Sequence, residues 1–367
     1  MGTREATAHQ ILTKPSFRGN HRVKRKSSMP TVADVARLAG VGAITVSRAV
    51  NETSYVSEEK KKRIRDAIKK LGYRPNQAAR VLKGNRAKMI GLIIPDLADL
   101  FFGKCAAAIE EYASLHGYMT LIVASNRNHE LQENEVAMMI GQNVAGLIVV
   151  PSLPSESLRQ LSATDVPIVA FDRPLEGAIA DEVVVENLGG AQMAVNHLIE
   201  HGHKRIACVG YDKSSYAIGH RILGYTEAMW ARRLKPEVYD EVETLDDTLK
   251  LARRWKKIKD HPTAIFSLNN VSTRHLLWAL REVNLAIPQK IALIGFDDLE
   301  LAALLSPPLT VIRQPAANLG VQASKLLFER IAAAKHPEGG FGIKLVLPVE
   351  FVIRESCGCP PAKHAKN

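Results

Sequence analysis

The sequence has 367 residues, is 46% hydrophobic and contains 49 Lys and Arg against 38 Asp and Glu. This length predicts two or three domains of a soluble protein with buried cores. No apolar run approaches the ~20 residues of a membrane-spanning helix, and residues 1–28 lack the apolar core of a secretion signal. We therefore expect a cytoplasmic protein without a membrane partner. Four cysteines are too few and too scattered for a disulfide framework.

Positive charge is concentrated at the N-terminal end. Residues 1–88 contain 21 Lys and Arg against six Asp and Glu, whereas the remainder contains 28 against 32. A basic end on an otherwise ordinary chain is typical of a nucleic-acid-binding head. Part of the excess lies in a basic leader, residues 1–28, which we expect to be disordered.

The first predicted elements are two short helices within residues 31–50, TVADVARLAGVGAITVSRAV. Thr31 and Asp34 have the spacing of a capping box, so the first helix is expected to begin after Thr31. Glycines 40 and 42 break it, and a second helix follows from about residue 43. Helix, short glycine-containing turn and helix is the geometry that lays a second helix in the major groove of DNA. A purely structural helical hairpin has the same pattern.

A third helix is expected to begin at Ser57, a capping residue followed by Glu58 and Glu59, and to end at Gly72. Its outer face carries a run of Lys and Arg. Such a run is usually only a solvated face, but beside a helix-turn-helix it indicates contact with phosphates. The next segment, YRPNQAARVLKGNR, is too short to hold a helix alone and is expected to order on binding.

From Met89 the sequence alternates short Val- and Ile-rich runs with helical stretches such as residues 104–116, 189–201 and 273–283. This alternation predicts parallel, doubly wound α/β sheets, and the number of strands suits two sheets better than one. The expected strands are residues 89–94, 119–124, 146–150, 167–171, 205–210, 264–268 and 291–296.

Ligands of doubly wound sheets bind beyond the carboxyl ends of the strands. Polar residues follow several of the expected strands and are therefore candidates for ligand contact. They are Asp96, Ser125, Asn126, Asp172, Arg173, Asn269, Asp297 and Asp298.

Signatures of catalysis are missing from the sequence. It contains no G-x-G-x-x-G at a strand–helix turn, no P-loop and no nucleophile elbow, so we expect no enzyme, no catalytic residue and no cofactor. His197 and His201 have H-x-x-x-H spacing but lack the glutamate of a zincin motif. Cys357 and Cys359 form a lone C-x-C in a short tail. We expect no metal at either place.

Several separated motifs carry a family resemblance: TVADVARLAGV, TVSRAVN, YVSEEKKKRI, LGYRPNQAARVLKG, IGLIIPDLADLFF, HLIEHGHKRIACVG, RILGY, PTAIFSLNN and IALIGFDDLELAALLSPPLTVIRQP. Together, over about residues 31–356, they resemble the LacI/GalR (lactose-repressor) family of bacterial transcription regulators. The resemblance implies a homodimer that represses transcription from a near-palindromic DNA operator and is controlled by a small carbohydrate-type effector. A purine- or nucleoside-responsive regulator of the same family is one alternative, and a small-molecule binding protein without DNA function is another.

The resemblance also implies the fold class. A small all-α helix-turn-helix head and a hinge helix would precede an α/β core of two doubly wound parallel-sheet lobes, like a periplasmic-binding protein. The implied boundaries are 31–75 for the head, 76–88 for the hinge, 89–356 for the core and 357–367 for a tail. Within the core, lobe 1 would comprise about residues 89–184 and 314–340, and lobe 2 about residues 185–313 and 341–356.

By position, the resemblance puts Ala43 and Ile44 at the specificity positions of the recognition helix. Arg48 falls where the family has a base-reading arginine, which suits bidentate contact with guanine. In the hinge, Leu82 matches the leucine that wedges into a minor-groove step, with Ala79 beside it; hydrophobic packing is the alternative. The other expected DNA contacts are Thr31, Thr45, Ser47, Asn51, Tyr55, Ser57, Asn76 and Arg80.

The resemblance places four polar residues around the effector, with two phenylalanines as an apolar wall. Carboxylates, an amide and a guanidinium suit the hydroxyls of a polyol, and Arg173 would favour an acidic sugar. The alternative for the guanidinium is a structural ion pair. Asn270 stands where the family usually has an aspartate. The expected effector residues are Phe101, Phe102, Asp172, Arg221, Asn269 and Asp297.

Overall fold

The computed structural model describes residues 30–51, 54–73, 87–152, 155–177, 180–213, 215–333 and 342–360. The chain divides into two compact units, residues 1–79 and 80–367. Several expectations lie outside the described residues: the basic leader, nearly all of the hinge with Asn76, Ala79, Arg80 and Leu82, the side chain of Asn51, and the end of the tail.

The described part of the first unit consists of α1 (Val32–Ala39), α2 (Ala43–Asn51) and α3 (Glu58–Leu71). The predicted capping box is present, because Thr31 N donates to Asp34 Oδ2 at 2.9 Å and Asp34 N donates to Thr31 Oγ1 at 3.4 Å. Ser57 occupies the N-cap position of α3, but its side chain makes no capping hydrogen bond. Buried Val35, Val46 and Ile64 join the three helices in one small core.

The first lobe of the second unit contains a sheet in the order β11-β5-β4-β3-β1-β2, in which every pair of neighbouring strands is parallel. Along β1, Ile90, Leu92 and Ile94 belong to one core cluster and Ile93 to another, because side chains alternate between the faces of a strand. The strands are β1 (Met89–Ile94), β2 (Met119–Ala124), β3 (Leu147–Val149), β4 (Ile168–Phe171), β5 (Asp181–Val185) and β11 (Lys344–Leu347).

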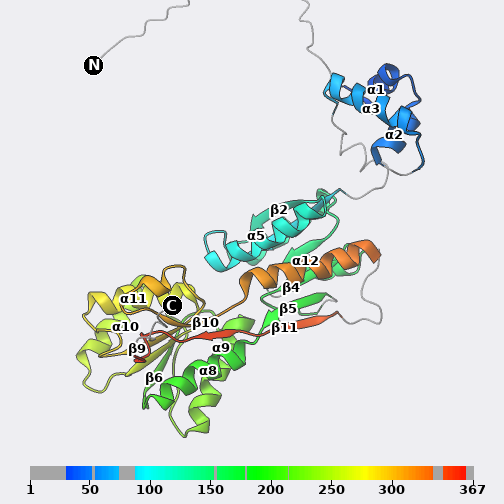
Figure 1. The fold of residues 1–367 in the computed structure, drawn as a ribbon. Helices are drawn as coiled ribbons and strands as arrows, with labels where there is room; N and C mark the ends of the chain where they lie inside the picture. Colours follow the sequence, from blue (N-terminus) through cyan, green and yellow to red (C-terminus); the bar gives the residue numbers. More distant parts are fainter. Residues whose placement is uncertain are drawn as a thin grey trace, which may run out of the picture. The chain divides into compact units, whose positions relative to one another are not determined.

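Helices cover both faces of this sheet. Side chains of α5 (Leu100–Leu115) and α12 (Ala316–Ala333) share one core cluster, and those of α6 (His129–Gly141) and α7 (Glu156–Ser162) share the other. Figure 1 shows α12, in orange, beside α5, in cyan. Gly320 permits this close approach, because a Cβ there would lie 2.5 Å from the Cys105 carbonyl oxygen.

The second lobe repeats the arrangement, with a sheet in the order β12-β10-β9-β8-β6-β7. Its strands pair in parallel except β12, which runs antiparallel to β10. The strands are β6 (Ile206–Val209), β7 (Glu237–Tyr239), β8 (Ala264–Ser267), β9 (Ala292–Phe296), β10 (Thr310–Arg313) and β12 (Glu350–Val352). Side chains of α8 (Asn187–Glu200) and α9 (Tyr216–Ala231) pack on one face, and those of α10 (Leu245–Lys257) and α11 (Asn270–Glu282) on the other. A short 3-10 helix, η1 (Ala302–Leu304), follows β9.

The predicted fold class is confirmed, and all seven expected strands are present. Three described crossings connect the lobes, after β5, after β10 and after β11. The expectation that residues 341–356 belong to lobe 2 is correct for β12 but wrong for β11. β11 instead pairs with β5, Leu345 opposite Val183, and so extends the sheet of lobe 1.

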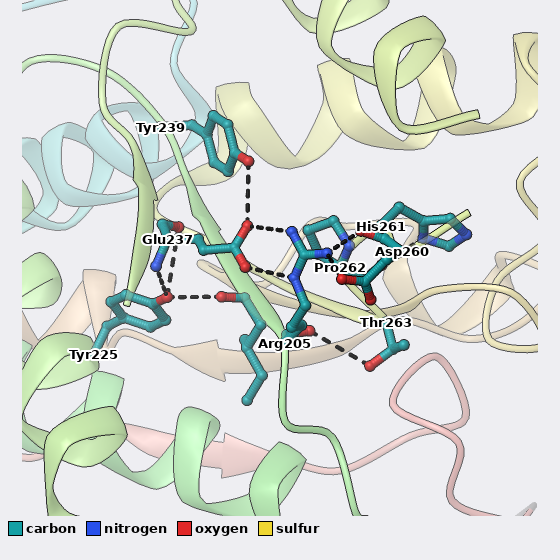
Figure 2. A network of polar contacts seen from close by, with 9 residues as sticks. Arg205, Tyr225, Glu237, Tyr239, Asp260, His261, Pro262 and Thr263 are labelled. Atoms are coloured by element: carbon teal, nitrogen blue, oxygen red, sulfur yellow. Dashed lines mark hydrogen bonds and ion pairs between the residues drawn. The ribbon is translucent and has the colours of Figure 1, made fainter. Parts of the chain in front are cut away.

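A polar network fixes β7 at the edge of the second sheet (Figure 2). The Tyr225 hydroxyl donates to the Ile206 carbonyl and accepts from Glu237 N, both at 2.7 Å. Arg205 reaches the Glu237 carboxylate with Nε at 2.7 Å and Nη2 at 2.9 Å. Since Tyr225 is fully buried, its hydroxyl gives both backbone groups a hydrogen-bond partner away from solvent.

No helix in the described part of the chain is both long enough and apolar enough to cross a membrane.

Candidate functional site

The expected recognition helix α2 presents two different groups to solvent. Ile44 is 70% exposed, and Arg48, four residues on and therefore on the same face, is exposed as well. Val46 is fully buried in the core of the head, whereas Ala43 is exposed and Thr45 and Ser47 are half-buried. One side of the helix therefore packs into the core of the head through Val46, and the opposite side presents the Arg48 guanidinium and the Ile44 side chain to solvent.

The other described candidates for DNA contact lie around this helix. Tyr55 is 93% exposed, which is unusual for a large aromatic side chain in a protein of this size. Thr31 is exposed, but its hydroxyl also caps α1, because it donates to Asp34 Oδ2 at 2.7 Å and accepts from Asp34 N. Ser57 is half-buried at the start of α3.

Between the two lobes of the second unit lies a cavity of about 60 Å³. All six expected effector residues line it. Three come from lobe 1, namely Phe101 and Phe102 of α5 and Asp172 after β4; three come from lobe 2, namely Arg221 of α9, Asn269 after β8 and Asp297 after β9.

Arg221 is the central cation of this cavity and is only 3% exposed. Its Nε donates to Asn187 Oδ1 at 2.9 Å and its Nη1 donates to the Leu268 carbonyl at 2.7 Å. The guanidinium lies 3.7 Å from the centre of the Phe296 ring. Burial lowers the pKa of Arg221, and the neighbouring carboxylates of Asp297 and Asp172 oppose this effect. The side chain is therefore held rigidly by neutral acceptors and an aromatic face.

Asp172 and Asp297 have left-handed backbones, with φ of 64° and 79°, directly after β4 and β9. Burial raises the pKa of both carboxyl groups. For Asp172 the charges of Arg173 and Arg221 oppose the rise, and for Asp297 the charge of Arg221 and a hydrogen bond from Gln314 do so. Two buried carboxylates thus face one buried guanidinium across a small space.

Asn269 contributes an amide whose oxygen is already used. Its Oδ1 accepts from Ser272 N at 2.8 Å and caps α11, so its NH₂ group is the part available to a ligand. The cap explains why an asparagine suits this position at the end of β8.

A second, larger cavity of about 530 Å³ adjoins the first and shares Phe101, Asp297 and Gln314 with it. A buried hydrogen bond lies where they meet: Asn270 Nδ2 donates to Asp99 Oδ1 at 2.7 Å. Asn270 lines the larger cavity and belongs to lobe 2, whereas Asp99 lines the smaller one and belongs to lobe 1. This bond therefore links the lobes directly.

Further contacts also cross between the lobes, among them Lys344 Nζ of β11, 5.7 Å from the centre of the Tyr216 ring of α9. The Arg127 guanidinium lies 5.4 Å from the centre of the Tyr211 ring, and Lys104 Nζ lies 3.8 Å from Glu300 Oε1. Two buried polar atoms beside the cavities, Asn270 Oδ1 and Gln314 Oε1, have no hydrogen-bond partner among the described residues, and the buried Arg173 Nε has only a long ion-pair contact of 3.5 Å with Asp172 Oδ2. Buried polar atoms are normally paired, so these atoms are candidates for ligand contact.

Comparison with known proteins decides the family. Residues 31–76 match the family model of bacterial regulatory proteins, lacI family, and residues 195–357 match a periplasmic binding protein-like domain. The chain is 32% identical to the HTH-type transcriptional repressor PurR of Vibrio atlanticus, an alignment that covers 85% of this chain and 95% of that protein. This chain belongs to the LacI family. It is a DNA-binding transcriptional repressor.

Solved structures of two transcriptional regulators align with most of this chain. The Lac repressor dimer bound to operator and the anti-inducer ONPF superposes with a TM-score of 0.79 at 26% identity, covering 90% of this chain and 99% of that one. A complex of the transcriptional regulator CelR with cellobiose has a TM-score of 0.64 at 28% identity, covering 89% and 99%.

Sequence reasoning missed three residues of this LacI-family core: Asp99, Asn270 and Gln314. Asp99 caps α5 by accepting from Phe101 N at 2.9 Å, and Gln314 Nε2 donates to Asp297 Oδ1. The available signals were weak. Asn270 stands out in the sequence only as a departure from the usual aspartate, and Gln314 follows β10, a strand that the sequence does not predict.

Proposed function

We propose that this LacI-family repressor binds DNA as a homodimer and responds to a small polyhydroxylated effector, a monosaccharide or sugar acid, in the smaller interlobe cavity. The observation that carries the proposal is that the six expected effector residues, which belong to two helices and three strand ends, line one cavity and come equally from both lobes.

The chemistry of the lining favours hydroxyl groups. A hydroxyl both donates and accepts, so it can satisfy Asp172 or Asp297 as a donor and Arg221 or Asn269 as an acceptor. The Phe101 and Phe102 rings, 5.0 Å apart, supply an apolar surface for the carbon face of a sugar ring. The complex of CelR with cellobiose shows that a relative of this fold takes a sugar.

Binding would require the lobes to move. The cavity of about 60 Å³ is far below the ~300–1,000 Å³ typical of small-molecule sites. Separation of the lobes would break the bond between Asn270 and Asp99 and enlarge the smaller cavity. An effector that binds one arrangement of the lobes more tightly than the other shifts their populations by that difference in affinity.

A purine or nucleoside effector is the second candidate. It is supported by the repressors named PurR, which are the relatives at 31–32% identity. Three aromatic side chains line the cavity, Phe101, Phe102 and Tyr211, and could stack on a flat base. The carboxylate-rich polar lining favours the sugar.

A thermal-shift screen of the full chain against sugars, sugar acids, polyols, nucleosides and purines tests the proposal. Only a ligand of the folded state raises the melting temperature. We expect a rise with a sugar or sugar acid, and its loss in Asp172→Asn. Arg274→Ala is the matched control, because Arg274 lines only the larger cavity. Loss of the shift in Arg274→Ala alone would place the ligand elsewhere, and a response only to purines would replace the sugar.

A further inference from the structure

A cluster of histidine and cysteine side chains lies in lobe 2, away from the interlobe cavities. His197 belongs to the last turn of α8, and His201 caps that helix. Cys357 and Cys359 follow β12 near the C-terminal end of the described chain. The sequence alone predicts no metal at either pair, but the fold brings the two pairs together.

The distances from Cys359 to the two imidazoles match those between ligands of one zinc ion. Cys359 Sγ lies 3.5 Å from His197 Nε2 and 3.4 Å from His201 Nε2. In a tetrahedral zinc site, bonds of ~2.3 Å to sulfur and ~2.0–2.1 Å to nitrogen place the two ligand atoms about 3.5 Å apart. The ligand atoms of His197, Cys357 and Cys359 all lie within 4.8 Å of one another.

The local structure gathers the four side chains at the end of α8, with His201 reaching the group through Cys359 Sγ and the His197 ring. Positions 197 and 201 are one helical turn apart, so both rings project from the same face of α8, with centres 4.4 Å apart. Gly358 has φ of 95°, a conformation that favours glycine, and it separates the two cysteines in the turn after β12. That turn is closed by Gly358 N donating to the Glu355 carbonyl at 3.0 Å.

The surroundings supply the support that metal ligands normally have. Thr310 Oγ1 donates to Cys357 Sγ at 3.2 Å, and Arg354 N donates in turn to Thr310 Oγ1 at 2.9 Å. Such hydrogen bonds orient a thiolate ligand and disperse its charge. His197 packs edge-on against Phe351 of β12, with ring centres 5.0 Å apart.

We propose that His197, His201, Cys357 and Cys359 form a structural zinc site that fastens the C-terminal segment of the chain to α8. Two thiolates and two imidazoles are a ligand set that selects Zn²⁺ among the common divalent ions, and four protein ligands leave no open position for catalysis. Coordination replaces the protons of both thiols, so binding releases protons to solvent.

The test uses full-length protein purified without chelators and without an added histidine tag. We expect about one zinc per chain by elemental analysis, and a cobalt-substituted protein with the visible bands of tetrahedral Co²⁺ and thiolate-to-cobalt charge transfer. Cys359→Ser and His201→Gln should each weaken zinc binding by more than about 100-fold, since loss of even a supporting group costs 10–100-fold. Both side chains are at least partly exposed, so these variants should fold.

His203→Gln is the matched control. His203 is two residues beyond His201, but its Nδ1 lies 2.9 Å from Thr263 Oγ1 and outside the cluster. It should bind zinc like the wild type. Zinc should also protect Cys359 from alkylation, a readout that does not depend on DNA binding. Wild-type protein that takes up no zinc at micromolar concentration, that binds copper or iron in its place, or that binds zinc equally in Cys359→Ser would overturn the proposal.

Discussion

Asn270 and Asp99 are 171 positions apart in the chain and meet in a buried hydrogen bond of 2.7 Å, from Asn270 Nδ2 to Asp99 Oδ1. Each residue stands at the start of a helix, Asn270 as the first residue of α11 and Asp99 as the N-cap of α5. Their bond joins the positive ends of two helices that belong to different lobes, and places a carboxylate between them. An aspartate at position 270 would place a second carboxylate there.

Asn270→Asp should therefore destabilise the protein at pH 7. The change removes a hydrogen bond to a charged acceptor and brings two carboxylates into contact, which we expect to lower the free energy of unfolding by about 1–3 kcal/mol. Urea unfolding of the wild type and the variant measures the difference. The double variant Asp99→Asn/Asn270→Asp restores an amide opposite a carboxylate and should recover most of the loss. Equal stability of all three proteins would show that this bond does not hold the lobes.

Arg48→Ala should weaken specific operator binding by about 1–3 kcal/mol for each half-site contact, because a bidentate arginine–guanine pair contributes that much. Fluorescence anisotropy at fixed salt, on an operator selected with the wild-type protein and on a scrambled sequence, separates specific from general binding. Arg37→Ala removes the same charge from α1, where Arg37 pairs with Asp34 at 3.1 Å, and serves as the control. If Arg48→Ala bound the operator like the wild type, the assignment of α2 as recognition helix would be wrong.

Six of the seven strands that periodicity predicts are almost fully buried, because continuous Val and Ile runs between turn residues carry a strong local signal; the seventh, β2, is a half-buried strand at the edge of its sheet. The five strands that the sequence does not predict are short, and each carries polar or charged residues or lies at a sheet edge. β5 begins at Asp181, a charged residue whose buried carboxylate forms an ion pair with Arg330 Nε at 2.9 Å. β7 has only three residues, all half-buried. Such strands are defined by their neighbours in the sheet rather than by their own sequence.

The same distinction applies to the candidate sites. Asp172, Asn269 and Asp297 could be chosen because each directly follows a predictable strand. The Asn270–Asp99 bond and the approach of Cys359 to His197, 162 positions apart, arise only from tertiary packing. A local pattern contains no information about which distant segment will lie opposite, so these contacts required the structure.

Comparing the pH dependence of stability of the wild type with that of Asp172→Asn should reveal the raised pKa of Asp172. Burial raises that pKa, so the folded state binds a proton at a higher pH than the unfolded state, whose aspartate titrates near ~3.9. The stabilisation from protonation is complete below the unfolded pKa and is lost as the pH rises through the folded pKa. The free energy of unfolding of the wild type, relative to Asp172→Asn, should therefore increase as the pH falls from 7 towards 4.

Asp298→Asn is the control, because the pKa of Asp298 is lowered whereas that of Asp172 is raised. Burial opposes the ionisation of Asp298, but hydrogen bonds from Arg354 and Arg313 outweigh it and hold the pKa below its ordinary value. The stabilisation from Asp298 is present above the unfolded pKa and disappears as the pH falls through the folded one. The wild type's advantage over Asp298→Asn should stay level from pH 7 to about 4 and shrink below that. Parallel curves for both variants would contradict the assigned shifts.

Tyr225→Phe should lower the free energy of unfolding by about 1–3 kcal/mol, because it leaves the Glu237 N–H and the Ile206 carbonyl without their buried partner (Figure 2). Tyr239→Phe is a matched control in the same network. Its hydroxyl donates to Glu237 Oε2 at 3.4 Å, a carboxylate that Arg205 already satisfies through two bonds, so its loss should cost less. Urea unfolding of the two variants, with operator binding measured in parallel, separates a stability effect from a functional one. A larger loss in Tyr239→Phe than in Tyr225→Phe would show that the carboxylate, rather than the strand backbone, is what the network holds in place.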